Sequence, residues 1–405
     1  MEEYLLMHKD IVTAKFKATN TGEIAELSLV RDNLMHLPLP VQKIINIPEI
    51  YIEDYAAYKS QDILTVNEEG IGLFEVWIGD RTVPPYRENK RLYIPKDITA
   101  FEYMLSNHSY SFTDCYWTKK VTESLNWEAV KWINNKKLDT LSLIESNRKQ
   151  GELYSEVNST LTGQLEKYWY CTVNKNAKHL MLAKITLNNQ ILTIREIIAS
   201  RIYEKQVYKN HCKYSYIHNK EGKIIGCKCK AFTSDQDELI TAYDLLKAEG
   251  ITQFKDVYNN IVYRAEVYGA DVDKVRKQLD IQTIVDYLIT NRDRHQNNIG
   301  FIRDPDTLQI KYMAPIFDSG SSICLEGERP ESVEHTTTHN LCDTELECLK
   351  QVKDINAINL NRLPKDEWIL NELSKAEDLS EYRVKRMFNL YKDKVEYIRY
   401  LQKSV

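Results

Sequence analysis

Three polar residues in the second half of the chain have the types and spacing that phosphoryl transfer requires. Asp293 is followed five residues later by Asn298, and Asp318 comes twenty residues after that asparagine. In this chemistry one carboxylate orients the attacking hydroxyl and accepts its proton, while an amide oxygen and a second carboxylate hold Mg²⁺ against the triphosphate. The set therefore predicts a kinase-type reaction with Asp293 as the base and with Asn298 and Asp318 as metal ligands.

An aspartate and an asparagine at this spacing are common, so a solvated polar loop is the alternative when the pair is taken alone. The flanking sequence favours the site. An apolar stripe over residues 279–289 predicts a helix before the loop, and residues 299–302 predict a strand after it. A return strand at 308–313 would bring Asp318 back beside the loop.

The neighbours of these three residues also have expected roles. Arg292, Arg294 and His295 make the loop cationic, which suits the negative charge that develops on the transferred group. Gly320 is expected to permit the tight exit that a metal-binding Asp318 needs.

Two residues further upstream predict an ion pair. Lys184 lies in an apolar run, residues 180–185, which predicts a strand that directs one lysine at the phosphates. Glu196 begins a helical pattern and is the expected partner of Lys184. A solvated strand lysine and a glutamate favoured only by the helix dipole remain the alternatives.

The candidate phosphate loop, residues 159–167, is rich in hydroxyls and has only one glycine, Gly163. Without a glycine-rich pattern, backbone amides and the hydroxyls of Thr160 and Thr162 would have to cradle the phosphates. A plain hairpin turn is the alternative for this segment.

Lys230 and Phe232 precede the first expected helix of the larger lobe and are the candidate adenine hinge. Backbone groups would pair with the base there, so the identity of the two side chains adds little.

The length of 405 residues favours two or three domains over a single core. Alternation over residues 12–18 and 25–29 predicts strands, residues 73–78 form another buried piece, and the polar run 145–152 is the expected boundary. Helices are expected at 127–144, 193–203, 237–248, 257–268, 279–289 and 381–402. The expected regions are an N-terminal accessory α+β region at 1–145, a small β-rich lobe at 155–232 and a larger helical lobe at 233–405.

Composition narrows the class of protein further. A formal net charge of −5 argues against a dedicated nucleic-acid binder, so no direct nucleic-acid binding is expected. No signal peptide or membrane-spanning run is visible, and the eight scattered cysteines indicate reduced thiols, which together predict a cytoplasmic protein with no membrane association. His211 and its neighbouring cysteines lack a C-x-x-C spacing, so ordinary thiols are favoured over a zinc site there.

The motif D-R-H-Q-N-N at residues 293–298, together with A-P-I-F-D at 314–318, resembles the HipA-like serine/threonine kinase family. Its D-R-H-x-x-N core is shared with phosphatidylinositol kinases. The resemblance covers about residues 155–400. The accessory region of stand-alone HipA-like proteins is similar to Trp77 with Arg81, Pro84 and Arg87, and to residues 113–117, which concerns the fold only. It implies a two-lobed protein-kinase-like fold, with ATP and Mg²⁺ as cofactors, and a helix-turn-helix antitoxin-type protein as a partner class.

The resemblance carries over residue by residue. The family's strand lysine, here Lys184, contacts the α- and β-phosphates. The family usually has Gly-x-Gln-x-Lys in its phosphate loop, whereas Gln164 follows Gly163 directly here, so the exact loop contacts are not carried over. Loop autophosphorylation in such families leads us to expect modification at Ser159, Thr160 or Thr162, with self-inactivation as the result.

These observations predict an ATP- and Mg²⁺-dependent serine/threonine protein kinase that transfers the γ-phosphate to a protein hydroxyl. A lipid or small-molecule kinase would use identical residues, although no basic amphipathic helix supports a lipid substrate. A non-catalytic module that binds nucleotide and signals through its N-terminal region is the alternative from another class.

Overall fold

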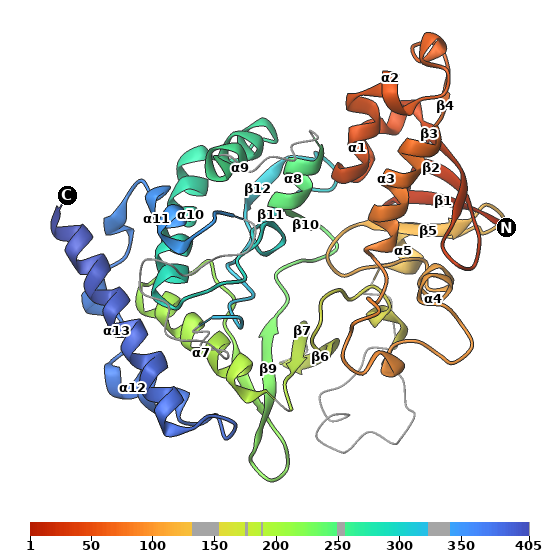
Figure 1. Ribbon diagram of the computed structural model, residues 1–405. Coiled ribbons are helices and arrows are strands. Elements are labelled where there is room, and N and C mark those ends of the chain that lie inside the picture. The colour runs from red at the N-terminus through yellow and green to blue at the C-terminus, as the bar shows by residue number, and fades with distance from the viewer. Residues whose placement is uncertain (132–153, 175–176, 188, 249–255, 323–340, 405) are drawn as a thin grey trace.

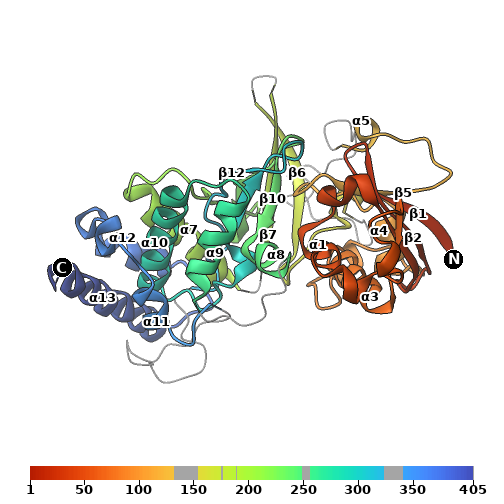
Figure 2. The same cartoon turned by 90° about the horizontal axis from the view of Figure 1, so that it is seen from above.

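The computed structural model describes residues 1–131, 154–174, 177–187, 189–248, 256–322 and 341–404 (Figure 1). These residues form antiparallel sheets and packed helices, which confirms the predicted α+β class. Three sheets follow one another along the chain. The second sheet lies between the N-terminal part and the helices of the C-terminal part, as Figure 2 shows from above.

The first sheet belongs to the N-terminal part and has the strand order β4-β3-β2-β1-β5. Its strands are β1 (Glu2–His8), β2 (Ile11–Ala18), β3 (Ile24–Val30), β4 (Ile63–Thr65) and β5 (Tyr116–Lys120). The two predicted strands correspond to β2 and β3. No strand is predicted at β1, because Leu6, Met7 and His8 are all buried and the run therefore lacks a clean alternation.

Short helices cover this sheet and connect its strands. They are η1 (Arg31–His36), α1 (Leu39–Asn46), α2 (Pro48–Tyr51), η2 (Tyr55–Ala57), α3 (Glu68–Gly79), η3 (Lys90–Leu92), α4 (Ala100–Ser106) and α5 (Trp127–Val130). The buried run at 73–78 lies in α3, where Phe74 packs against Phe16 of the sheet. The helix predicted at 127–144 is shorter where it is described, because α5 ends at Val130 and Lys131 has an extended ψ of 145°. The rest of that range and the boundary at 145–152 lie outside the described residues.

The second sheet has the order β6-β7-β9-β8 and is flanked by one long helix. Its elements are η5 (Glu156–Asn158), β6 (Lys167–Asn174), β7 (Ala177–Ile185), α7 (Gln190–Lys205), β8 (Ser215–His218) and β9 (Ile224–Lys230). β7 and β9 approach so closely that a Cβ at Gly226 would lie 2.1 Å from the carbonyl oxygen of Lys184. A glycine is therefore required beside the lysine of the predicted site.

The third sheet is small, with the order β10-β11-β12, and the remaining helices surround it. These elements are β10 (Glu238–Thr241), α8 (Ala242–Ala248), α9 (Val257–Val267), α10 (Val272–Leu288), η6 (Gln296–Asn298), β11 (Gly300–Arg303), β12 (Ile310–Met313), α11 (Glu345–Lys350), η7 (Ile355–Ala357), η8 (Leu360–Arg362), α12 (Asp366–Leu373) and α13 (Glu381–Ser404). The helix predicted over 237–248 is wrong in its first half. Glu238 begins a strand that pairs with β11, because its carboxylate is bound by distant parts of the chain.

One hydrophobic core joins the long helices to one another. Ile198 of α7, Ile284 of α10 and Ile398 of α13 are all fully buried in it. α10 ends in this core directly before the motif at 293–298, so the motif follows a helix that is fixed by packing.

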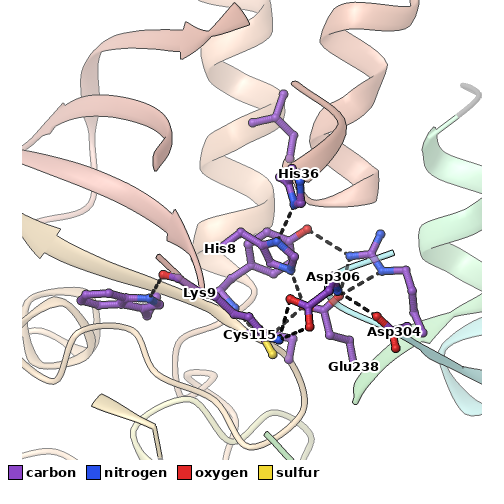
Figure 3. A network of polar contacts seen from close by, with 12 residues as sticks. His8, Lys9, His36, Cys115, Glu238, Asp304 and Asp306 are labelled. Carbon is purple, nitrogen blue, oxygen red and sulfur yellow. Dashed lines mark hydrogen bonds and ion pairs between the residues drawn. The ribbon is translucent and has the colours of Figure 1, made fainter. Parts of the chain in front are cut away.

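A buried polar network fastens the N-terminal sheet to the third sheet (Figure 3). Glu238 is fully buried, and its carboxylate contacts His8 Nε2 at 2.9 Å and Arg303 Nη2 at 2.7 Å. Arg303 also donates to the hydroxyl of Tyr116 at 3.1 Å. Because β1, β5, β10 and β11 all contribute, the network couples parts of the chain that are far apart in sequence.

Candidate active site

Lys184 of β7 lies between two carboxylates. Its buried amino group is 2.6 Å from Glu196 Oε1 and 2.7 Å from Asp318 Oδ1, and it also lies over the ring of Tyr214 at 5.3 Å. The expected Lys184–Glu196 ion pair is therefore present. The lysine is not a solvated strand residue, because its amino group is buried and bound to both carboxylates.

Glu196 connects β7 to the segment around Asp318. It is the seventh residue of α7 rather than a helix-starting residue, so its position is not explained by the helix dipole, which acts within the first turn. Its second carboxylate oxygen accepts the backbone N–H of Ser319 at 2.9 Å. One buried side chain thus fixes both the lysine and the residue after Asp318.

The charges at this centre support one another. Burial opposes the charged form of Lys184, but Asp318 and Glu196 outweigh it and raise the pKa of the lysine. Burial likewise opposes ionisation of Asp318, but Lys184 and Lys167 outweigh it and lower the pKa of that carboxyl below its usual range. The side chain of Asp318 remains 44% exposed, whereas that of Glu196 is 3% exposed. Asp318 is consequently the ionised carboxylate that can exchange its partner.

The backbone at Asp318 has the left-handed conformation, with φ of 56°. Aspartate tolerates this region better than most residues, and such outliers gather at functional sites. The glycine at position 320 is explained by packing rather than by the tight turn that we expected. A Cβ there would lie 3.2 Å from the carbonyl oxygen of Leu192 in α7, so this glycine permits close packing against the helix.

Arg294 joins the motif loop to the segment that carries Asp318. Its guanidinium is buried and forms an ion pair with Asp286 at 2.8 Å. One nitrogen, Nη1, donates to the carbonyl oxygens of both Asn298 and Phe317, at 3.0 and 2.7 Å. The expected catalytic charge of Arg294 is therefore not supported, because Asp286 neutralises it and the arginine acts as a structural clamp.

The loop presents Asp293 and Asn298 in complementary ways. The amide nitrogen of Asn298 donates to the backbone carbonyl of Asp293 at 3.0 Å, which leaves the amide oxygen of Asn298 for another partner. The carboxylate of Asp293 accepts no hydrogen bond from any residue that the structure describes, and the residue is half-buried. A carboxylate in this state is available to accept a proton.

The predicted hairpin is present and returns the chain to the loop. β11 and β12 pair antiparallel, with Phe301 opposite Met313, and the chain then continues to Asp318. Phe317 stacks on Phe232 of the candidate hinge, with ring centroids 5.6 Å apart. Within the described residues, neither the N–H nor the C=O of Phe232 is hydrogen-bonded, whereas Lys230 is the exposed last residue of β9.

The candidate phosphate loop has an unusual backbone. The N–H groups of residues 162–166 donate no hydrogen bond to any part of the chain that the structure describes. The carbonyl oxygens of Leu161, Gln164 and Leu165, in contrast, all accept hydrogen bonds from the N-terminal region. Consecutive unpaired amides are the arrangement that binds anions. The loop follows η5 and precedes β6, so it is not a turn between paired strands.

The hydroxyls of this loop differ in accessibility. Thr160 is buried and donates to the carbonyl oxygen of Tyr110 at 2.8 Å, so its hydroxyl is not free for a phosphate, contrary to expectation. Ser159 is also buried, whereas Thr162 is exposed. Gly163 has φ of 91°, which explains why the turn has a glycine there.

Lys167 is the last residue of the candidate phosphate loop, and the sequence interpretation gave its side chain no role. A Cβ at Gly163 would lie 2.7 Å from Lys167 Nζ, so the amine packs directly against the loop glycine. In the described residues this amine forms no ion pair, and burial lowers the pKa of Lys167 to about 7, although nearby Asp318 partly offsets that effect. Lys167 lies opposite Lys184 in the pairing of β6 with β7, a position that depends on strand register. The sequence feature that could have indicated it is a single lysine before an aromatic strand.

No group of three His, Cys, Asp or Glu side chains that could hold a metal ion is found among the described residues. The same part of the chain contains no helix of the length and apolarity needed to cross a membrane.

Comparisons with known proteins give structural matches alone. No protein-family model and no curated protein sequence matches the chain. It is similar to the crystal structure of the proinflammatory kinase CtkA of Helicobacter pylori, with a TM-score of 0.41 and 18% identity over 60% of this chain and 94% of that one. It is also similar to a structure of the toxin–antitoxin system of HipA, HipB and operator DNA from Shewanella oneidensis MR-1, with a TM-score of 0.45 and 10% identity over 97% of each chain.

Proposed function

We propose that this chain is an ATP-dependent kinase of the HipA-like type. The observation that carries the proposal is the position of Lys184 between Glu196 and Asp318. Phosphotransferases with the kinase scaffold require a strand lysine, a helix glutamate and a metal-binding aspartate together. Arg294 holds the motif loop next to this group of residues, because it donates to the backbone carbonyls of both Asn298 and Phe317.

Each residue has one role in this proposal. Asp293 accepts the proton of the attacking hydroxyl, since its carboxylate faces no other donor in the described chain. Lys184 binds the phosphates and Glu196 orients it. Backbone amides 162–166 cradle the triphosphate, and the backbone at Lys230 and Phe232 pairs with the adenine.

The residues at the centre fit Mg²⁺. Within the described residues the amide oxygen of Asn298 accepts no hydrogen bond, and Asp318 has an ionised, partly exposed carboxylate. Mg²⁺ binds one or two such protein oxygens together with phosphates and water. When bound, the ion would neutralise charge on the phosphates. Asp318 would then exchange its contact with Lys184 for the metal.

The substrate that we propose is a serine or threonine hydroxyl of a protein. A lipid or small-molecule kinase would use the same residues. The solved toxin–antitoxin structure contains a partner protein and DNA; by analogy, an antitoxin-type protein is the partner class that we propose for this chain.

Incubation with γ-labelled ATP and Mg²⁺ tests the proposal, with either protein mixtures or phosphoinositide vesicles as acceptors. The wild type should label protein, and Asp293→Ala should reduce the rate by about 10²–10⁴-fold while ATP binding is retained. Asp306→Ala, which changes an exposed aspartate on the β11–β12 turn, is the matched control and should keep the rate. If only the lipid is labelled, the chain is a lipid kinase and not a protein kinase. If ATP binds but no phosphate is transferred, the non-catalytic nucleotide-binding module is supported.

A further inference from the structure

One short segment of the N-terminal region, residues 87–93, runs along the outside of the phosphate loop. Arg87 donates from Nη1 to the carbonyl oxygen of Leu165 at 2.5 Å and from Nη2 to that of Leu161. Its guanidinium therefore spans the two ends of the turn at Gly163. It stacks on the ring of Tyr93, with Cζ 5.2 Å from the ring centroid.

The rest of the segment continues these contacts. The N–H of Glu88 donates to the carbonyl oxygen of Gln164 at 2.9 Å. The hydroxyl of Tyr93 donates to the carbonyl oxygen of Lys167 at 2.6 Å and accepts the N–H of the same residue at 2.8 Å. In each of these hydrogen bonds the loop contributes a backbone group. The segment 87–93 therefore fixes the path of the loop independently of the loop's side chains.

The burial of Arg87 is not explained by an ion pair within the described residues. Only 4% of the residue is exposed, and in the described chain its guanidinium forms no ion pair. The buried charge is instead compensated by two carbonyl oxygens and one aromatic face. Such an arrangement requires the loop to keep its shape, because loss of either carbonyl would leave a buried N–H group of the guanidinium without an acceptor.

The orientation of the peptide groups connects this clamp to the nucleotide. In a trans peptide the C=O of one residue and the N–H of the next point in opposite directions. Since the carbonyls of 161, 164 and 165 point at the N-terminal region, the N–H groups of 162, 165 and 166 point away from it. These are members of the unpaired row of amides that we assign to the phosphates.

We propose that Arg87 is a positioning residue for the nucleotide, which turns the loop amides toward the triphosphate, so that the N-terminal region completes the ATP site. This inference rests on the proposed kinase function. The competing explanation is that Arg87 only stabilises the packing of the N-terminal region. The two explanations differ in whether the KM for ATP changes.

Steady-state kinetics on the full chain, with Mg-ATP as the varied substrate, distinguish them. Arg87→Gln should raise the KM for ATP by about tenfold to a hundredfold, the range for lost hydrogen bonds to a charged group, with a much smaller change in kcat. Arg87→Lys should fall between this variant and the wild type, because an ammonium lacks the planar fork that spans two carbonyls. The melting shift with ADP should decrease in the same order.

Arg81→Gln is the matched control. Arg81 is another arginine of the N-terminal region with little exposure, 9%, but it binds Asp114 and the carbonyls of Ser109 and Tyr116 and makes no contact with the loop. It should lower the melting temperature and leave the KM for ATP unchanged. An equal rise in KM for both arginine variants would overturn the inference.

Tyr93→Phe keeps the ring and removes only the hydroxyl that bonds to Lys167, so it provides a test if Arg87→Gln does not fold. We expect its KM for ATP to rise by about twofold to tenfold. A wild-type KM in this variant, or in a folded Arg87→Gln, would show that the clamp does not position the nucleotide. A wild-type chain that binds neither ATP nor ADP would instead overturn the proposed function itself.

Discussion

Lys184 has two carboxylate partners, and their different exposure indicates which contact is permanent. Glu196 is buried in the helix that packs on the sheet and is also bound to the N–H of Ser319, so it cannot turn away without loss of two interactions. Asp318 is 44% exposed. We infer that the Lys184–Asp318 contact is the one that nucleotide and metal replace.

The metal role of Asp318 is testable by ligand-induced stabilisation. A ligand at a hundred times its dissociation constant adds about 2.7 kcal/mol to the free energy of unfolding, which is visible as a rise in melting temperature. Asp318→Asn should reduce the part of the ATP-induced rise that depends on Mg²⁺, because a neutral amide binds the ion more weakly. Differential scanning fluorimetry with ATP, with and without Mg²⁺, measures it.

Asp306→Asn provides the comparison for this variant, because Asp306 is an exposed aspartate that contacts only Lys9 among the described side chains. Its Mg²⁺-dependent rise should equal that of the wild type. Equal rises with and without Mg²⁺ in the wild type would contradict the metal assignment.

At the scale of elements, Thr162 is the accessible hydroxyl among the three considered in the phosphate loop. It could be phosphorylated by the active site of the same chain or by that of a second copy. Thr162 is exposed, whereas Thr160 is bonded to Tyr110 and Ser159 is buried. The structure thus narrows the three hydroxyls considered for autophosphorylation to one preferred residue. A phosphate there would add a charge of about −1.5 to −2 next to Gly163, on which Lys167 packs, and would compete with ATP for that lysine.

We therefore predict slow self-inactivation on incubation with Mg-ATP, with phosphate on Thr162. Thr162→Val should abolish the modification and extend activity, and Asp293→Ala should abolish it together with catalysis. Thr160→Val is the internal comparison and should still be modified. Intact-mass spectra and peptide mapping decide the site; an unmodified loop in a chain that phosphorylates other proteins would exclude this regulation.

At the scale of the whole molecule, Glu238 connects the N-terminal sheet to the third sheet (Figure 3). Burial opposes ionisation of this carboxyl, but Arg303 and His8 outweigh burial and lower its pKa well below its usual range. A carboxyl whose pKa is lower in the folded chain stabilises the fold above its unfolded pKa, about 4.3. This contribution is lost as the pH falls below that value.

Glu238→Gln should destabilise the chain by about 3–5 kcal/mol at neutral pH, because Arg303 would remain buried without its partner. Denaturant unfolding measures this, and the difference between variant and wild type should shrink as the pH is lowered below about 4.3. Lys9→Ala, which removes an ion pair with an exposed aspartate, should cost less than about 1 kcal/mol. A difference for Glu238→Gln that stays constant with pH would contradict the role of its charge.

Local patterns in the sequence were sufficient for much of the fold. Helices α7, α9 and α13, strands β2, β3 and β7, and the β11–β12 hairpin are close to their predicted positions, whereas α10 begins at Val272, well before the predicted helix at 279–289. The roles of Asp293, Asn298 and Asp318 follow from their order and spacing and stay predictions. The predicted pairing of Lys184 with Glu196 is observed as well.

Other features were decided by contacts between residues far apart in the chain, which no local pattern encodes. Glu238 lies in a strand because Arg303 and His8 bind its carboxylate, although its sequence surroundings favour a helix. Arg294 became a clamp because Asp286 and two carbonyls surround it.

The same reason applies to the phosphate loop, where the sequence by itself determined a glycine and several hydroxyls. Only the tertiary structure showed that Thr160 faces the N-terminal region, that Lys167 packs on Gly163 and that Arg87 fixes the loop backbone. Side-chain type determines which chemistry a residue can perform, whereas its neighbours in space, brought together by packing, determine which of its groups are free to perform it.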